Sequence, residues 1–196
     1  KISSTYLGNA AFVDCNLIII QGPPGFGKTT FLDRLWTDPG IRARYDLVFR
    51  ASCDPKMPPE VFFDHCLRKL LPAEDLRPGH ATVLNADLQR SLRGKHIIFL
   101  VDNLSSPAEI NVLRPLVQLG CLLVVATRSL DVARQAEYAN VVELTAYSIN
   151  DVLEYYSTNY KQEFSLLTQE EMCQLADAVC YNPLGLNIAL RRVAEE

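Results

Sequence analysis

The feature that most constrains this chain is a glycine-rich segment, Gly22-Pro-Pro-Gly-Phe-Gly-Lys-Thr29-Thr30, which fits the pattern G-x-x-x-x-G-K-[ST] at every fixed position. An apolar run at residues 16–21 precedes the segment, and a helical pattern at residues 30–36 comes after it. A glycine/proline turn that contains a lysine by coincidence would not need these flanks. A buried strand, a glycine loop and a helix in this order predict a phosphate-binding loop.

The residues of this loop each have a predicted role. Its glycines lack a Cβ atom, so backbone N–H groups can turn inward around a phosphate. The helix that begins near Lys28 directs its positive end at the same phosphate. We expect Lys28 to reach the β- and γ-phosphates and the Thr29 hydroxyl to bind Mg²⁺. The predicted nucleotide-binding residues of the loop are Gly22, Pro23, Pro24, Gly25, Phe26, Gly27, Lys28, Thr29 and Thr30.

A second apolar run, at residues 97–101, ends in Asp102 and Asn103. Taken alone, this pattern is typical of a buried strand followed by a turn. With the glycine loop upstream, it predicts the second half of the site, in which the Asp102 carboxylate holds Mg²⁺ at the carboxyl edge of a sheet. We expect Lys28, Asp102 and Asn103 to act on the phosphates and on an attacking water. Asn103 can orient a water by hydrogen bonding but cannot accept its proton.

The remaining pattern predicts an α/β fold. Short apolar strands at residues 47–51, 121–126 and 141–144 alternate with helical patterns. This alternation favours a five-stranded parallel sheet covered by helices on both faces. Arg128 directly follows one of these strands, which places it at the edge where ligands bind. Further expectations are a turn at residues 37–40, helices at residues 61–71 and 82–92, and a helix that begins with a capping box at residues 106–109.

After Leu144 the sequence shows helical patterns and no further apolar strand. Capping boxes at residues 148–151 and 168–171 begin two helices, and a third helical pattern starts after Pro183. We therefore expect a nucleotide-binding domain at residues 1–146 and a small helical domain at residues 147–196.

Charge and hydropathy exclude two classes of partner. The formal net charge is −4, which argues against a nucleic-acid surface. No apolar run approaches the ~20 residues that span a bilayer. The first residues do not form a recognisable signal peptide, so we expect a soluble, cytoplasmic protein.

Taken together, five segments resemble the NB-ARC branch of the STAND class of P-loop ATPases, which includes plant intracellular immune receptors of the NLR type. Residues 22–30 and 97–103 resemble its Walker A and Walker B motifs. Residues 37–52 resemble a segment typical of the plant receptors, residues 124–129 resemble the "TTR" sensor segment, and residues 180–187 resemble the "GLPL" segment. The resemblance covers nearly the whole chain.

The resemblance implies further roles. Arg128 would contact the γ-phosphate and so distinguish ATP from ADP, and Pro183 would pack on the adenine. The strand that ends before Arg128 would lie between the Walker A and Walker B strands. This sequence departs from the family pattern at Asn103, which stands where a second acid is usual. The segment around Pro183 is one residue shorter than usual, and residues 1–15 show no Gly-Arg-Glu-like motif.

Three functions are compatible with these patterns. The first is an ATP/ADP-binding switch with Mg²⁺, in which the nucleotide state controls activation and self-association of a larger receptor in defence signalling. The second is a P-loop ATPase or kinase with ordinary turnover, although a kinase usually needs an arginine-rich lid and no arginine cluster stands out. The third is a scaffold that retains only the fold. Intact Lys28, Thr29 and Asp102 argue against the scaffold. Of the other two functions we favour the switch, with at most slow ATP hydrolysis.

Overall fold

The computed structural model describes residues 16–54, 56–62, 92, 94–136, 139–160 and 167–195. The expected lead-in at residues 1–15 lies outside these ranges. So do the helices expected at residues 61–71 and 82–92, apart from residues 61, 62 and 92. The described chain forms two compact units. The first contains residues up to Gln21 together with Lys28–Glu143, and the second contains Gly22–Gly27 together with the chain from Leu144.

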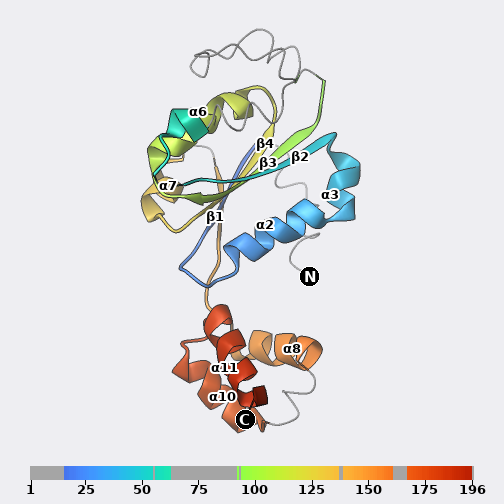
Figure 1. Ribbon diagram of the computed structural model, residues 1–196, viewed down its shortest axis with the longest axis vertical. Coiled ribbons are helices and arrows are strands. Elements are labelled where there is room, and N and C mark those ends of the chain that lie inside the picture. The colour runs from blue at the N-terminus through green and yellow to red at the C-terminus, as the bar shows by residue number, and fades with distance from the viewer. Residues whose placement is uncertain are drawn as a thin grey trace. The chain divides into compact units, whose positions relative to one another are not determined.

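The first unit is built on a five-stranded sheet in which every pairing is parallel. The strands are β1 (Leu17–Gln21), β2 (Leu47–Ser52), β3 (Ile97–Leu104), β4 (Leu122–Thr127) and β5 (Asn140–Glu143), in the spatial order β2-β3-β4-β1-β5 (Figure 1). The fold class predicted from the sequence is therefore confirmed. β4 lies between β1 and β3, as the resemblance implied.

Helices cover both faces of this sheet. They are α2 (Lys28–Thr37) and α3 (Pro39–Arg44) on one face, and α6 (Pro107–Gln118) and α7 (Leu130–Gln135) on the other (Figure 1). Five residues of β3, from Ile97 to Val101, are at most 1% exposed. A strand that is covered on both faces has no solvent side, which is why its sequence is a continuous apolar run.

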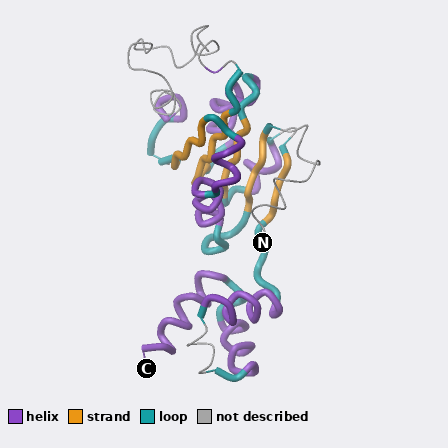
Figure 2. Tube along the Cα trace, turned by 90° about the vertical axis from the view of Figure 1, so that its right-hand side faces the viewer, coloured by secondary structure: helices purple, strands orange, loops and turns teal. Residues whose placement is uncertain are grey.

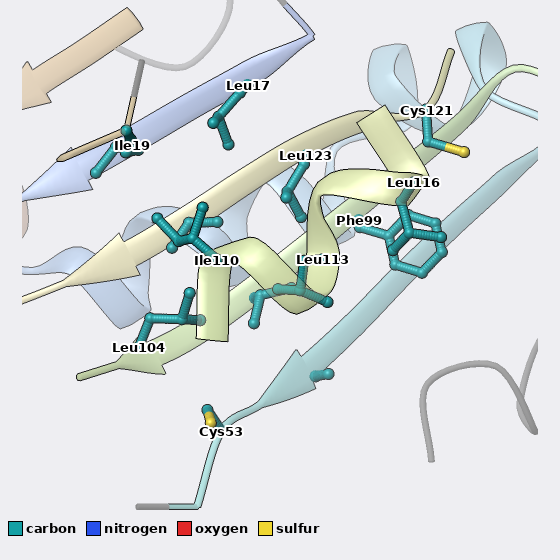
Figure 3. Packing of buried hydrophobic residues seen from close by; sticks show 14 of the residues in the cluster. Leu17, Ile19, Cys53, Phe99, Leu104, Ile110, Leu113, Leu116, Cys121 and Leu123 are labelled. Carbon is teal, nitrogen blue, oxygen red and sulfur yellow. The ribbon is translucent and has the colours of Figure 1, made fainter. Parts of the chain in front are cut away.

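The α6 face contains a large hydrophobic cluster. Ile110, Leu113 and Leu116 of α6 recur at helical spacing and pack on Phe99 of β3 and Leu123 of β4 (Figure 3). Each of these five side chains is at most 2% exposed. This packing fixes β3 and β4 side by side, so the loops at their carboxyl ends begin from a rigid base.

Two short helices were not expected from the sequence. The turn predicted at residues 37–40 is instead the start of α3, because the Asp38 carboxylate accepts hydrogen bonds from the N–H groups of Gly40 (2.8 Å) and Ile41 (3.0 Å). Pro39 is the first helical residue, where its missing N–H costs nothing. α7 begins in the same way, with the Ser129 hydroxyl accepting from the N–H of Val132 at 3.3 Å.

In the second unit the structure describes three helices: α8 (Ile149–Asn159), α10 (Gln169–Ala178) and α11 (Pro183–Glu195) (Figure 2). The predicted capping boxes begin α8 and α10. The helices share a core of Val152, Tyr156, Met172, Ala176, Leu186 and Leu190, all at most 1% exposed. Among the described residues, no helix is both long enough and apolar enough to cross a membrane.

Candidate functional site

Three charged residues predicted from the sequence share the carboxyl edge of the sheet. Lys28 is the first residue of α2, Asp102 lies near the end of β3, and Arg128 directly follows β4. Lys28 is only 8% exposed. Burial lowers the pKa of the Lys28 amine, the positive charge of Arg128 lowers it further, and the negative charge of Asp102 opposes both effects. Arg128 and Asp102 therefore both lie close enough to Lys28 to act on its charge.

Each oxygen of the Asp102 carboxylate has a different neighbour. Its Oδ1 atom accepts a hydrogen bond from the N–H of Asn103 at 2.9 Å, and its Oδ2 atom lies 3.9 Å from Nη2 of Arg50. The carboxylate oxygens are of the type that Mg²⁺ prefers. No cluster of three or more His, Cys, Asp or Glu side chains occurs in the described ranges. This donor set fits Mg²⁺, which typically takes one or two protein oxygens and completes its shell with phosphates and water.

Asn103 has a structural task beside the one predicted for it. Its φ of 62° lies in the left-handed region, which asparagine tolerates better than most residues. The pairing of β3 with β4 shifts register between Val101 and Leu104. The Asn103 side-chain N–H donates a hydrogen bond to the carbonyl of Cys53 at 3.1 Å, beyond the end of β2. The amide therefore connects two strand ends at the edge where Asp102 lies.

A buried threonine positions the turn that carries Arg128. The Thr127 hydroxyl is completely buried and donates to the carbonyl of Leu104 at 2.7 Å. The same oxygen accepts from the N–H of Ser129 at 3.0 Å. Arg128 itself is exposed, but the residues on both sides of it are fixed. Sequence reasoning did not identify this role of Thr127, although a hydroxyl residue as the last of an apolar strand was a visible signal.

Glu109, an acid close to the end of β3 in sequence, is fully engaged elsewhere. Its carboxylate accepts from the N–H of Ser105 (2.6 Å), the Ser105 hydroxyl (3.1 Å) and the N–H of Ser106 (3.1 Å). The side chain is 4% exposed. The bond from the Ser106 N–H belongs to the capping box of α6, so the Glu109 carboxylate stabilises the start of that helix.

The glycine loop has the backbone conformation that its sequence requires. Gly25 and Gly27 have φ values of 81° and 82°, which side-chain-bearing residues rarely adopt. In the same unit, the Asn182 side-chain N–H donates to the carbonyl of Pro24 at 3.2 Å. The N–H of Leu184 donates to the carbonyl of Gly25 at 3.3 Å. A Cβ atom on Gly25 would lie 2.8 Å from Oδ1 of Asn182, so this approach requires glycine.

Asn182 also begins α11. Its Oδ1 atom accepts from the N–H groups of Leu184 (2.9 Å) and Gly185 (3.1 Å), while Pro183 is buried as the first residue of the helix. The other predicted residues of the loop segment differ in exposure: Gly22 is buried, Phe26 is partly buried, and Pro23, Pro24, Thr29 and Thr30 are exposed. The predicted contact of Pro183 with adenine stays a prediction.

Comparison with known proteins places this chain in context. The family model of the NB-ARC domain matches residues 10–163. Among solved structures, the chain is similar to a STAND (Signal Transduction ATPase with Numerous Domains) protein with a tetratricopeptide repeat sensor from Pyrococcus horikoshii. That similarity has a TM-score of 0.62 at 17% identity and covers 90% of this chain and 27% of the other. At this identity it shows the fold alone, and the chain spans about a quarter of that protein.

Two other solved structures are more distant. Cdc6p from Pyrobaculum aerophilum has a TM-score of 0.47 at 17% identity, covering 71% of this chain and 41% of the other. AMPPCP-bound DnaA from Aquifex aeolicus has a TM-score of 0.47 at 15% identity, covering 83% and 50%. No curated protein matches the sequence.

Proposed function

This chain belongs to the NB-ARC family, and from that premise we propose that it is the ATP- and ADP-binding switch domain of a larger receptor. One observation carries the proposal: a buried Lys28 at the start of α2 shares the carboxyl edge of the sheet with Asp102 and Arg128. A cation that burial disfavours is stabilised when phosphate arrives, so this edge suits a polyphosphate. The nucleotide would be ATP or ADP together with Mg²⁺.

The proposal gives each group a task. The N–H groups of Gly22–Gly27 and the Lys28 amine would bind the phosphates. The Thr29 hydroxyl and the Asp102 carboxylate would hold Mg²⁺, which supplies positive charge against the phosphate oxygens. Arg128 would contact the γ-phosphate. Pro183 would pack on the adenine from the helical domain, with Phe26 and Thr30 completing the cradle.

A switch arises from the difference between the two nucleotides. ATP and ADP differ by one phosphate, and that local charge can bias a bistable arrangement of domains. In this proposal residues 1–146 hold the phosphates and residues 147–196 respond to them. Activation would then proceed through self-association and the receptor's other domains. The plant-like segment at residues 37–52 favours a role in defence signalling and innate immunity, with the protein in the cytoplasm.

We expect hydrolysis to be slow, so that the domain retains whichever nucleotide it holds. Glu109 is engaged in the capping box, and Asn103 cannot accept a proton from water. A general base typically contributes 10²–10⁴-fold. Turnover should therefore fall well below the ~10 s⁻¹ of a typical enzyme.

Single-turnover hydrolysis of ATP by the wild type and by Asn103→Asp tests this expectation. Acceleration of at least about tenfold in Asn103→Asp supports it, because the variant gains a proton acceptor. Asn103→Gly is the matched control, since glycine keeps the positive φ but lacks the hydrogen bond to Cys53. Fast wild-type turnover that neither substitution changes would instead favour an ATPase with ordinary turnover.

The switch itself is tested by hydrogen exchange. Amide exchange in α8, α10 and α11 is compared between the protein saturated with MgADP and the protein saturated with Mg²⁺ and a non-hydrolysable ATP analogue. A switch predicts different protection in the two states, and Lys28→Ala should abolish the difference. Identical protection in the two wild-type complexes would contradict a switch while leaving nucleotide binding intact.

A further inference from the structure

Arg50 lies between two carboxylates on the α2 face of the sheet. It belongs to β2, two residues before Ser52, which is the register partner of Asp102 on β3. Nη2 of Arg50 lies 2.7 Å from Oδ1 of Asp33 on α2 and 3.9 Å from Oδ2 of Asp102. One nitrogen therefore faces both a residue of α2 and the carboxylate that is proposed to hold Mg²⁺.

The two ion pairs are unequal. The distance to Asp33 is that of a strong charge-assisted hydrogen bond, whereas the distance to Asp102 is too long for one. The Asp33 side chain is 49% exposed and the Asp102 side chain only 11% exposed. Arg50 is thus hydrogen-bonded to the solvent-exposed carboxylate of Asp33. Its positive charge also lies near the buried carboxylate of Asp102.

The arrangement is not optimised for stability. Nε of Arg50 is buried and has no hydrogen-bond partner among the described residues. Buried polar groups are nearly always paired, so an orphaned donor calls for an explanation. If the Arg50 guanidinium pairs alternately with Asp33 and Asp102, its N–H donors cannot all be hydrogen-bonded in either arrangement.

We propose that Arg50 is a positioning residue that competes with Mg²⁺ for Asp102 and so sets the Mg²⁺ dependence of nucleotide retention. This inference rests on the proposed function. Without metal, Arg50 compensates the buried charge of Asp102. When Mg²⁺ binds Asp102, Arg50 is repelled and remains wholly on Asp33. Asp33 is therefore the alternative partner of Arg50, here called the resting partner. Its carboxylate lowers the free-energy cost of moving the Arg50 guanidinium away from Asp102.

The competition predicts opposite effects for the two partners of the ion pair. Arg50→Gln removes the competing charge and should raise the Mg²⁺ affinity of the ADP-bound protein on the order of tenfold. Asp33→Asn removes the resting partner, leaves Arg50 on Asp102 and should lower that affinity. When Arg50→Gln is already present, adding Asp33→Asn should change the Mg²⁺ affinity little, because no arginine remains that could move to Asp102.

The experiment is a Mg²⁺ titration of each variant with a fluorescent ADP analogue bound, read as the rate of analogue dissociation at each free Mg²⁺ concentration. The affinity for the analogue is also measured in EDTA. The expected order of Mg²⁺ midpoints, from lowest to highest, is Arg50→Gln, wild type, Asp33→Asn. Arg50→Lys is the matched control that retains the charge, and its midpoint should stay near that of the wild type.

The outcomes separate this inference from the proposed function. If the wild type binds no analogue at any Mg²⁺ concentration, both fail. Intact analogue binding with equal Mg²⁺ midpoints in all variants overturns the Arg50 inference alone. An equal loss of analogue affinity in Arg50→Gln with and without Mg²⁺ also overturns it, since Arg50 would then contact phosphate. Thermal unfolding verifies folding, and if Arg50→Gln does not fold, the direction of the Asp33→Asn shift decides.

Discussion

Replacing Arg128 by alanine should change the preference of the site between ATP and ADP. Arg128 directly follows β4, in a turn that the hydrogen bonds of the Thr127 hydroxyl hold in place. The positive charge of its guanidinium lowers the pKa of Lys28. The contact proposed between Arg128 and the γ-phosphate would be available in ATP and missing in ADP. The substitution therefore removes a discriminating contact and leaves the strand that carries it unchanged.

The size of the effect comes from two contributions. A hydrogen bond to a charged group is worth about 1.5–3 kcal/mol, so ATP affinity should fall about 10- to 150-fold. ADP loses only the general attraction of an exposed charge, which is worth at most about 1 kcal/mol or a factor of about five. Because Arg128 lowers the pKa of Lys28, its removal also holds Lys28 more firmly charged, which limits the loss for both nucleotides.

Calorimetry with MgADP and with Mg²⁺ and a non-hydrolysable ATP analogue measures both affinities. Arg128→Lys is the matched control, because it keeps the charge but loses the paired donors of the guanidinium. It should retain ADP affinity and lose part of the affinity for the analogue. Equal losses for the two nucleotides in Arg128→Ala would refute the reasoning, since Arg128 would then act on a phosphate that both share.

Three further predictions concern stability and pH. Thr127→Val should lower the free energy of unfolding by about 2 kcal/mol in urea, because two hydrogen bonds disappear and the Leu104 carbonyl loses its donor; an unchanged free energy would contradict the positioning role. Asn182→Ala should destabilise the protein by about 1–2 kcal/mol in the same assay, whereas Asn182→Asp keeps the oxygens that cap α11, loses only the bond to Pro24 and should cost less; equal costs would show that the cap is unimportant. The lowered pKa of Lys28 should rise when phosphates bind, so the protein should take up protons on binding ADP at a pH between that lowered value and the ordinary 10.5, and ADP affinity should fall as pH rises through this window; calorimetry in two buffers of different ionisation enthalpy measures this uptake, and no uptake in the window would contradict the prediction.

Local sequence patterns predicted much of this structure. The apolar runs specified β1, β3 and β4 because strands covered on both faces leave no room for polar alternation. The spacing of serine or threonine and acid three residues apart specified the starts of α6, α8 and α10, because that cap is made within one turn of helix. The glycines predicted a turn that needs residues without a Cβ atom, and the positive φ values of Gly25 and Gly27 agree with this prediction.

Contacts across strands and between elements could not be predicted in this way. The pairing of Arg50 with Asp33 and Asp102 depends on the register of β2 on β3 and on the position of α2 above them. The role of Thr127 depends on the shifted register between β3 and β4. The sequence also suggested a turn at Asp38, because a helix cap and a turn use the same residue types and differ only in whether the next residues continue as a helix.

The central claim is that this site binds adenine nucleotide with Mg²⁺, and calorimetric titration of MgADP into the wild type and into Lys28→Ala tests it most directly. Lys28 is a buried cation that is proposed to bind the phosphates. Its removal should therefore weaken binding at least about tenfold, while the wild type binds with one site. Thermal unfolding of both proteins without nucleotide shows that the variant is folded. Equal affinity of the two proteins for MgADP, or no binding by the wild type, would contradict the account.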